Sequence, residues 1–138
     1  RLTAATIVTS QLDGIDLVHM AAASFGIDTR GLDKASTLKS IENFLHAEAR
    51  TGRRCLLVVD EAQNLEPTTL KTILTRIGDG TKVIFTGDTS QIDAPYMGES
   101  NNALAVLVQA FAGQSCFGHI TLESCERSEV ASLAAELL

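Results

Sequence analysis

The chain has 138 residues, of which 45% are hydrophobic and 20% are charged, a balance typical of one folded domain and not of a disordered segment. Its net charge of −6 argues against a broad basic surface for RNA or DNA, although a local basic groove stays open. The cysteines form no C-x-x-C pair, the histidines lack metal-ligand spacing and no apolar run has membrane length, so we expect a cytoplasmic protein without disulfides or zinc.

The first part of the chain predicts one strand and two helices. Residues 3–9 have the character of a short buried strand, and the alanine-rich run 13–25 predicts a helix. Asp33 is a suitable cap for a second helix, which ends at Thr51-Gly52. One face of that helix is apolar, through Leu38, Ile41 and Leu45.

The middle of the chain predicts two buried strands joined by a helix. Residues 55–59 form an unbroken apolar run, C-L-L-V-V, which predicts a central parallel strand covered on both faces. Pro67 suits the first turn of the next helix. Apolar residues recur there at helical spacing: Leu70, Ile73, Leu74 and Ile77. A second buried strand follows at residues 83–85.

The last part predicts a helix, a strand and a final helix. The first of these helices carries an apolar stripe of Leu104, Leu107, Val108 and Phe111. Residues 117–122 are expected to be a strand, and Ser128 can cap the final helix. Strands that alternate with helices predict a parallel α/β sheet.

Polar clusters follow three of the predicted strands, at residues 60–61, 86–88 and 123–127. Because the carboxyl ends of parallel strands meet at one edge of a sheet, we expect these clusters to form a single site.

The pair Asp60-Glu61 suits phosphoryl transfer. Such a reaction needs a metal holder, a group that orients the attacking water, and positive charge on the phosphate. Asp60 can hold Mg²⁺ through bound water, and Glu61 can act as the general base or orient the water. The alternative for the pair is a polar strand end that leads into a turn.

Residues beside this pair extend the candidate site. The Gln63 amide is placed to sense a γ-phosphate. Thr86, Asp88 and Gln91 would bring a hydroxyl, a carboxylate and an amide next to the same metal, and Gly87 permits close backbone approach. The alternative for this loop is an ordinary turn.

Arg127 would supply the positive charge, as a sensor of the γ-phosphate or an arginine finger. The alternative is a surface arginine paired with Glu126 or Glu129.

No phosphate-binding loop of the form G-x-x-x-x-G-K-[ST] occurs in the 138 residues. Without that loop we expect poor ATP affinity and a sheet that lacks its central strand. Three explanations stay open: upstream residues carry the loop, a partner supplies it, or ATPase function has been lost.

Four stretches from residue 58 onward form a specific set: V-V-D-E-A-Q-N-L (58–65), the run ending V-I-F-T-G-D (83–88), S-Q-I-D-A-P-Y (90–96) and F-G-H-I-T-L-E (117–123) leading into 126–138. Through these stretches the chain resembles, from about residue 56 onward, the PhoH-like family of P-loop ATPases. The resemblance implies ATP and Mg²⁺ as cofactors, a Walker B pair at Asp60-Glu61, a sensor-like motif at Thr86, Gly87, Asp88 and Gln91, and an arginine sensor at Arg127. It also implies a link to RNA remodelling.

The first half of the chain contains A-A-A-S-F-G-I-D-T-R-G-L-D-K (21–34) and the run 38–65. Through these stretches, residues 1–65 resemble instead the AAA-type ATPases of bacterial secretion and exopolysaccharide loci. Together the two imply a single partial P-loop domain over residues 1–138, with an AAA-like segment (1–55) and a PhoH-like segment (56–138). The fold class is an α/β three-layer sandwich with a parallel sheet, lacking the P-loop strand and helix.

Three functions follow as hypotheses. The first is a PhoH-like ATPase that lacks its phosphate-binding loop in these residues. The second is a non-catalytic binding or assembly module, in which the exposed sheet favours association, including homo-oligomers. The third is a secretion-type AAA ATPase.

Overall fold

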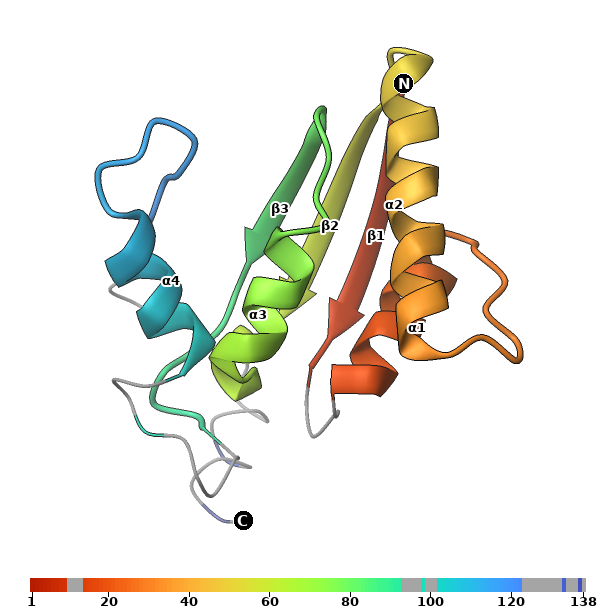
Figure 1. Ribbon diagram of the computed structural model, residues 1–138. Helices are drawn as coiled ribbons and strands as arrows, with labels where there is room; N and C mark the ends of the chain where they lie inside the picture. The colour runs from red at the N-terminus through yellow and green to blue at the C-terminus, as the bar shows by residue number, and fades with distance from the viewer. Residues whose placement is uncertain (10–13, 93–97, 99–101, 123–132, 134–136, 138) are drawn as a thin grey trace.

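A computed structural model describes residues 1–9, 14–92, 98, 102–122, 133 and 137. Figure 1 shows a three-stranded parallel sheet, with the strands in the order β1-β2-β3, and helices packed beside it. This arrangement confirms the predicted α/β class with a parallel sheet. The elements in chain order are β1 (Leu2–Val8), α1 (Gly14–Ser24), α2 (Lys34–Arg50), β2 (Arg54–Asp60), the 3₁₀ turn η1 (Ala62–Asn64), α3 (Pro67–Leu74), β3 (Thr81–Phe85) and α4 (Ala103–Phe111).

The predicted helix boundaries have the expected local causes. Asp33 caps α2 by accepting a hydrogen bond from the backbone N–H of Ser36 at 2.7 Å. Pro67 lies in the first turn of α3, where its missing N–H costs nothing. At α4 the cap is Asn102, whose side chain accepts from the N–H of Ala105 at 3.0 Å.

The cap of α2 predicts a pH effect on stability. The Ser36 N–H holds the pKa of Asp33 below its ordinary value of 3.8. A lowered folded-state pKa means that the cap stabilises the fold above pH 3.8 and loses this contribution as the pH falls through the folded pKa. We expect Asp33→Asn to melt like the parent near neutral pH, because Asn caps equally well, but to lose less stability on acidification. Thermal unfolding of both proteins from pH 7 to pH 3 checks this; parallel curves would contradict it.

The core lies between the helices and one face of the sheet. On β2 the side chains of Leu57 and Val59 point to this face, in register with Ala5 and Ile7 of β1. They pack among buried helix residues that include Leu17, Ala22, Ile41 and Leu45. Cys55 belongs to the same core, as expected, and burial raises the pKa of its thiol.

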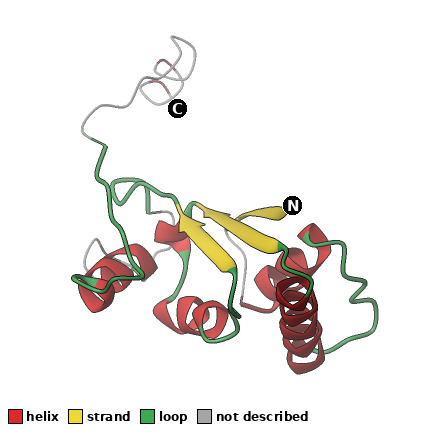
Figure 2. Cartoon of the chain, turned by 90° about the horizontal axis from the view of Figure 1, so that it is seen from above, coloured by secondary structure: helices red, strands yellow, loops and turns green. Residues whose placement is uncertain are grey.

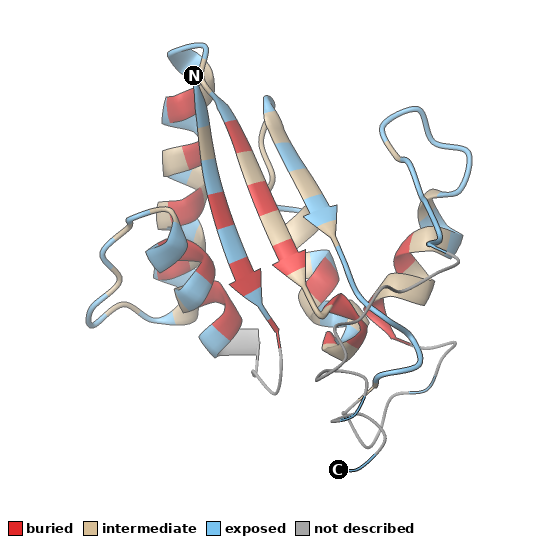
Figure 3. Cartoon of the chain, turned by 180° about the vertical axis from the view of Figure 1, so that it is seen from behind, coloured by how far each residue is buried: buried red, intermediate tan, exposed pale blue. Residues whose placement is uncertain are grey.

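The other face of the sheet is bare in the described part of the chain. Figure 2 shows every described helix on the same side of the sheet, and Figure 3 shows the exposed side. Leu56 and Val58 are only half-buried there, flanked by exposed Val8 and Ile84. Among the described residues, residues 55–59 are therefore covered on one face and not on both as expected, and these residues supply two layers of the predicted three.

The physical reason lies in the strand order. The chain steps in one direction, from β1 to β2 to β3, and a right-handed crossover in that direction always places its helix on the same face. A helix on the bare face would need a connection that runs the opposite way. The outer edge of β3 is likewise unpaired by the described residues.

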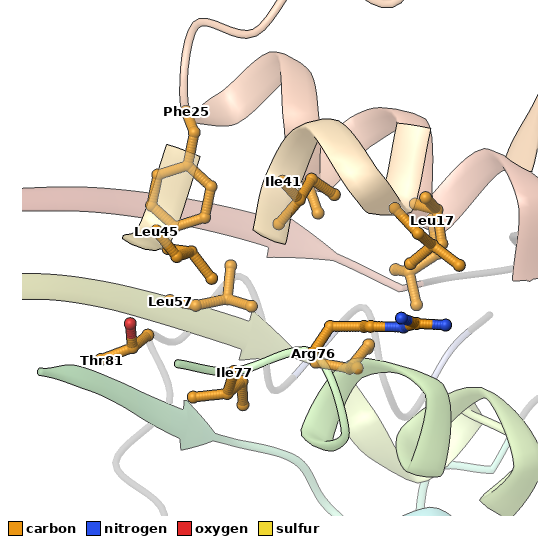
Figure 4. Close-up of a pocket in the computed structure, with 12 residues that line it drawn as sticks. Leu17, Phe25, Ile41, Leu45, Leu57, Arg76, Ile77 and Thr81 are labelled. Carbon is orange, nitrogen blue, oxygen red and sulfur yellow. The ribbon is translucent and has the colours of Figure 1, made fainter. Parts of the chain in front are cut away.

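The helix layer contains an apolar cavity between α1, α2 and α3, with Leu57 of β2 on its wall (Figure 4). Arg76 is the charged residue among those lining it, and its Nη1 already lies 3.6 Å from Glu42 Oε2. The cavity therefore presents no unpaired charge to a ligand.

Residues 117–122 are not a strand, which corrects the expectation from their apolar pattern. Ile120 is 83% exposed and Leu122 is 84% exposed. A strand needs a neighbour for its backbone hydrogen bonds, and no described strand lies alongside this segment. The helix expected from Ser128 lies outside the described residues. Among the described helices, none combines the length and the apolar content needed to cross a bilayer.

Candidate functional site at the carboxyl ends of β2 and β3

Asp60 and Thr86 meet where two adjacent strands end. The N–H of Thr86 donates to the carbonyl of Val59 at 3.0 Å, which continues the pairing of β3 with β2 by one residue. The Thr86 hydroxyl then donates to Oδ1 of Asp60 at 2.5 Å. Two of the polar clusters expected at the strand ends are thus in direct contact. By strand alternation, Asp60 follows Val58 on the bare side of the sheet.

Glu61 has a left-handed backbone, with φ 55° and ψ 35°. A residue with a Cβ adopts this conformation at a cost, and such residues cluster at functional sites. Its N–H donates to Asp60 Oδ1 at 3.0 Å. Its own Oε2 is buried and has no hydrogen-bond partner among the described residues. A buried carboxylate oxygen left without a donor is costly, and such an unsatisfied group requires an explanation.

The loop after β3 is organised by Asp88. Oδ1 of Asp88 accepts from the N–H of Ser90 at 2.9 Å and from its hydroxyl at 2.6 Å. Oδ2 accepts from Nε2 of Gln91 at 2.6 Å. Asp88 and Gln91 were expected to face the metal and the nucleotide. In this structure their side chains bind one another and close the loop.

Gln63 ties this loop to η1. The residue is 4% exposed. Nε2 of Gln63 donates to the carbonyl of Gln91 at 3.0 Å, and Oε1 accepts from the N–H of Asp88 at 3.2 Å. Both ends of the amide therefore bind backbone, so the side chain that we expected to sense a phosphate acts here as a link between two segments.

Gly87 permits a close backbone approach, as predicted, and the group that approaches it is the side chain of Gln63. A Cβ at Gly87 would lie 2.3 Å from Gln63 Oε1 and 2.7 Å from Leu104 Cδ1. Any residue larger than glycine would collide with the amide that holds the loop.

Thr9 is a site residue that sequence reasoning missed. It follows β1 directly, is 1% exposed, and its hydroxyl donates to the carbonyl of Glu61 at 2.6 Å. Its sequence position at the end of an expected strand, one strand away from Asp60-Glu61, was the available signal. No motif marks it.

The donor set is compatible with Mg²⁺ in one mode of binding. Among the described residues, no group of three or more His, Cys, Asp or Glu side chains could hold a metal ion by itself. Mg²⁺ commonly keeps several waters and takes one or two carboxylates together with substrate phosphates. Asp60 and the Thr86 hydroxyl fit that mode. Arg127, the expected source of positive charge, lies outside the described residues.

The model of the PhoH family, described as PhoH-like protein, matches residues 28–137. The chain belongs to the PhoH-like protein family. The match includes every site residue discussed above except Thr9, and it extends the PhoH resemblance upstream of the expected start at residue 56.

Curated PhoH relatives align with most of the chain. Protein PhoH2 of Bacillus subtilis (strain 168) is 43% identical over 98 residues, which are 71% of this chain and 22% of that protein. Protein PhoH2 of Mycolicibacterium smegmatis is 37% identical over 93 residues, which are 67% of this chain and 21% of that protein. The chain thus spans about a fifth of the length of these PhoH relatives. No solved structure gives a significant match. The AAA-type resemblance of residues 1–65 is not confirmed.

Proposed function

We propose that this chain supplies the magnesium-holding and water-orienting part of a PhoH-like ATPase, whose phosphate-binding loop lies outside these 138 residues. The observation that carries the proposal is the contact between Asp60 and Thr86 at the ends of neighbouring parallel strands, with the buried, unpartnered Oε2 of Glu61 in the next residue. This edge of a parallel sheet is where such folds bind ligands.

Each residue has a distinct task in this proposal. Asp60 holds the ion, while Thr86 and the Glu61 N–H fix the orientation of its carboxylate by bonding to Oδ1. Bound Mg²⁺ would supply charge that offsets the phosphate oxygens. Glu61 accepts a proton from the attacking water or orients that water. Because Asp60 lies on the bare side of the sheet, nucleotide phosphates can reach it without displacing a described helix.

Asp60→Asn tests the metal role. Asn preserves the shape and can still accept from Thr86, but it lacks the charge that Mg²⁺ prefers. In a protein where this chain follows a phosphate-binding loop, we expect ATP turnover to fall by about 10-fold or more, with a higher Mg²⁺ requirement. Asp79→Asn is the matched control, since Asp79 is exposed in the turn before β3. Equal Mg²⁺ dependence in the two variants would contradict the assignment.

A second candidate function is a binding or assembly module, favoured by the bare face of the sheet. Leu2 is 59% exposed, Val8 42% and Ile84 41%, and the outer edge of β3 has no described partner. Exposed apolar surface beside an open edge favours association, including with a second copy. Calorimetry of Mg-ATP on the 138-residue chain, combined with sedimentation, separates the two functions. Micromolar nucleotide binding by a monomer would count against this one.

RNA is a further proposed partner, and it rests on the family resemblance. The acidic net charge of −6 implies that RNA would bind through a local groove and not through a broad basic surface. RNA-stimulated ATP turnover would support it and would argue against a secretion-type AAA role, which predicts nucleotide-dependent oligomers without RNA dependence. A cytoplasmic location remains a prediction.

A further inference from the structure

The peptide group between Glu61 and Ala62 is held at both ends by different strands. Its carbonyl, on Glu61, accepts from the Thr9 hydroxyl at 2.6 Å, on the β1 side. Its N–H, on Ala62, donates to the carbonyl of Thr86 at 2.9 Å, on the β3 side. The peptide therefore bridges the two neighbours of β2 immediately after β2 ends.

This bridging explains the left-handed backbone of Glu61. A residue with a Cβ takes φ near +55° only when its surroundings impose that conformation. The Thr86 carbonyl fixes one side of the peptide, and Thr9 fixes the other. Thr9 is anchored in turn, because its own N–H donates to the carbonyl of Asp60 at 3.1 Å. With only 1% of the residue exposed, little water can compete for the hydroxyl.

We propose that Thr9 is a positioning residue for Glu61: its hydroxyl fixes the Glu61 backbone and thereby aims the Glu61 carboxylate. This inference rests on the proposed role of Glu61 in ATP hydrolysis. With Thr9, the residue after β1 joins the candidate site, whose other residues lie at or after the ends of β2 and β3. Thr9 touches neither substrate nor metal in this account. Its hydroxyl lies 2.6 Å from the Glu61 carbonyl and 3.0 Å from the Asp60 carbonyl, and the shorter contact is the one to Glu61.

Removing the hydroxyl tests this role, because the bond from the Thr9 N–H to the Asp60 carbonyl stays in place. Thr9→Val keeps the size and shape of the side chain and removes the donor. In this variant the Glu61 carbonyl still accepts a hydrogen bond from the N–H of Asn64 at 3.0 Å. The substitution therefore leaves no buried carbonyl without a donor. Thr9→Ser restores the donor and removes only a methyl group. Thr6→Val is the matched control, because Thr6 is exposed on the bare face of β1.

Two measurements test the proposal. In the 138-residue chain, the amides of Ala62 and Asn64 should exchange hydrogen faster in Thr9→Val than in the parent, and Thr9→Ser and Thr6→Val should match the parent. In a protein that includes a phosphate-binding loop, Thr9→Val should lower kcat for ATP by about 10-fold to 100-fold with an unchanged KM, because a misaimed base loses rate and not binding. Thr9→Ser should recover most of that loss.

The Thr9 variants give results that either support or overturn this role. Parent-like exchange and kcat in Thr9→Val would overturn the proposal, as would equal losses in Thr9→Val and Thr9→Ser. If Thr9→Val does not fold, Thr9→Ala replaces it in the comparison with Thr9→Ser under the same criteria. A parent-like turnover of Glu61→Gln would instead remove the catalytic role of Glu61, and the exchange experiment would still decide whether Thr9 holds its backbone.

Discussion

Glu61→Gln should lower ATP turnover by about 100-fold or more in a protein where this chain follows a phosphate-binding loop. Glutamine has nearly the same shape, so the left-handed backbone and its hydrogen bonds should persist. What disappears is the carboxylate that accepts a proton from water or orients it. Steady-state ATP hydrolysis at saturating Mg²⁺ measures the change, and KM should stay close to that of the parent.

The same substitution should leave stability intact or improve it. Oε2 of Glu61 is buried without a hydrogen-bond donor among the described residues, so the carboxylate is costly where it lies. A neutral amide reduces that cost. Loss of activity without loss of melting temperature distinguishes a functional residue from a structural one. Glu66→Gln, at an exposed glutamate before α3, is the control. If Glu61→Gln lowered the melting temperature as well as the activity, the result would argue against the functional assignment.

Gly87→Ala should lower the free energy of unfolding by about 1–3 kcal/mol, the usual cost of overpacking. The new methyl group would lie 2.3 Å from Gln63 Oε1 and 2.7 Å from Leu104 Cδ1, so both side chains must move. Displacing Oε1 also breaks its bond with the N–H of Asp88. We therefore expect the loop after β3 to detach from η1, with faster exchange of the Asp88 amide. Urea unfolding and hydrogen exchange measure the two effects.

Two comparisons sharpen this prediction. Gly118→Ala should be neutral, since a Cβ there meets nothing within 4 Å. In a Gln63→Ala background, Gly87→Ala should cost less than in the parent, because the amide oxygen it would strike is gone. If Gly87→Ala lowered the free energy of unfolding equally in both backgrounds, a collision with Gln63 would not be the cause of the destabilisation.

Local features of the sequence predicted the elements and the centre of the site. The apolar run 55–59 followed by Asp60-Glu61 predicted a parallel strand with carboxylates at its end, and β2 confirms the strand. Asp33 and Pro67 predicted two helix starts, which are confirmed. Such features depend on neighbours a few residues apart in the chain.

Sequence reasoning was wrong where the outcome depends on distant partners. Residues 117–122 have a strand-like apolar pattern, but no described strand pairs with them. The run 55–59 was expected to be covered on both faces, yet in the described part of the chain the sheet steps in one direction and its helices lie on one face. An apolar run shows that its side chains favour burial, but it does not show which layer of the fold lies against them.

The sequence by itself therefore determined that Asp60, Glu61 and Thr86 would gather at one edge, because parallel strands have their carboxyl ends together. Only the tertiary structure decided what the surrounding polar groups do. Both ends of the Gln63 amide bind backbone groups that lie 25 and 28 residues away in the chain. The Thr9 hydroxyl binds the carbonyl of Glu61, 52 residues away. A hydrogen bond between residues so far apart depends on strand register, which no local pattern encodes.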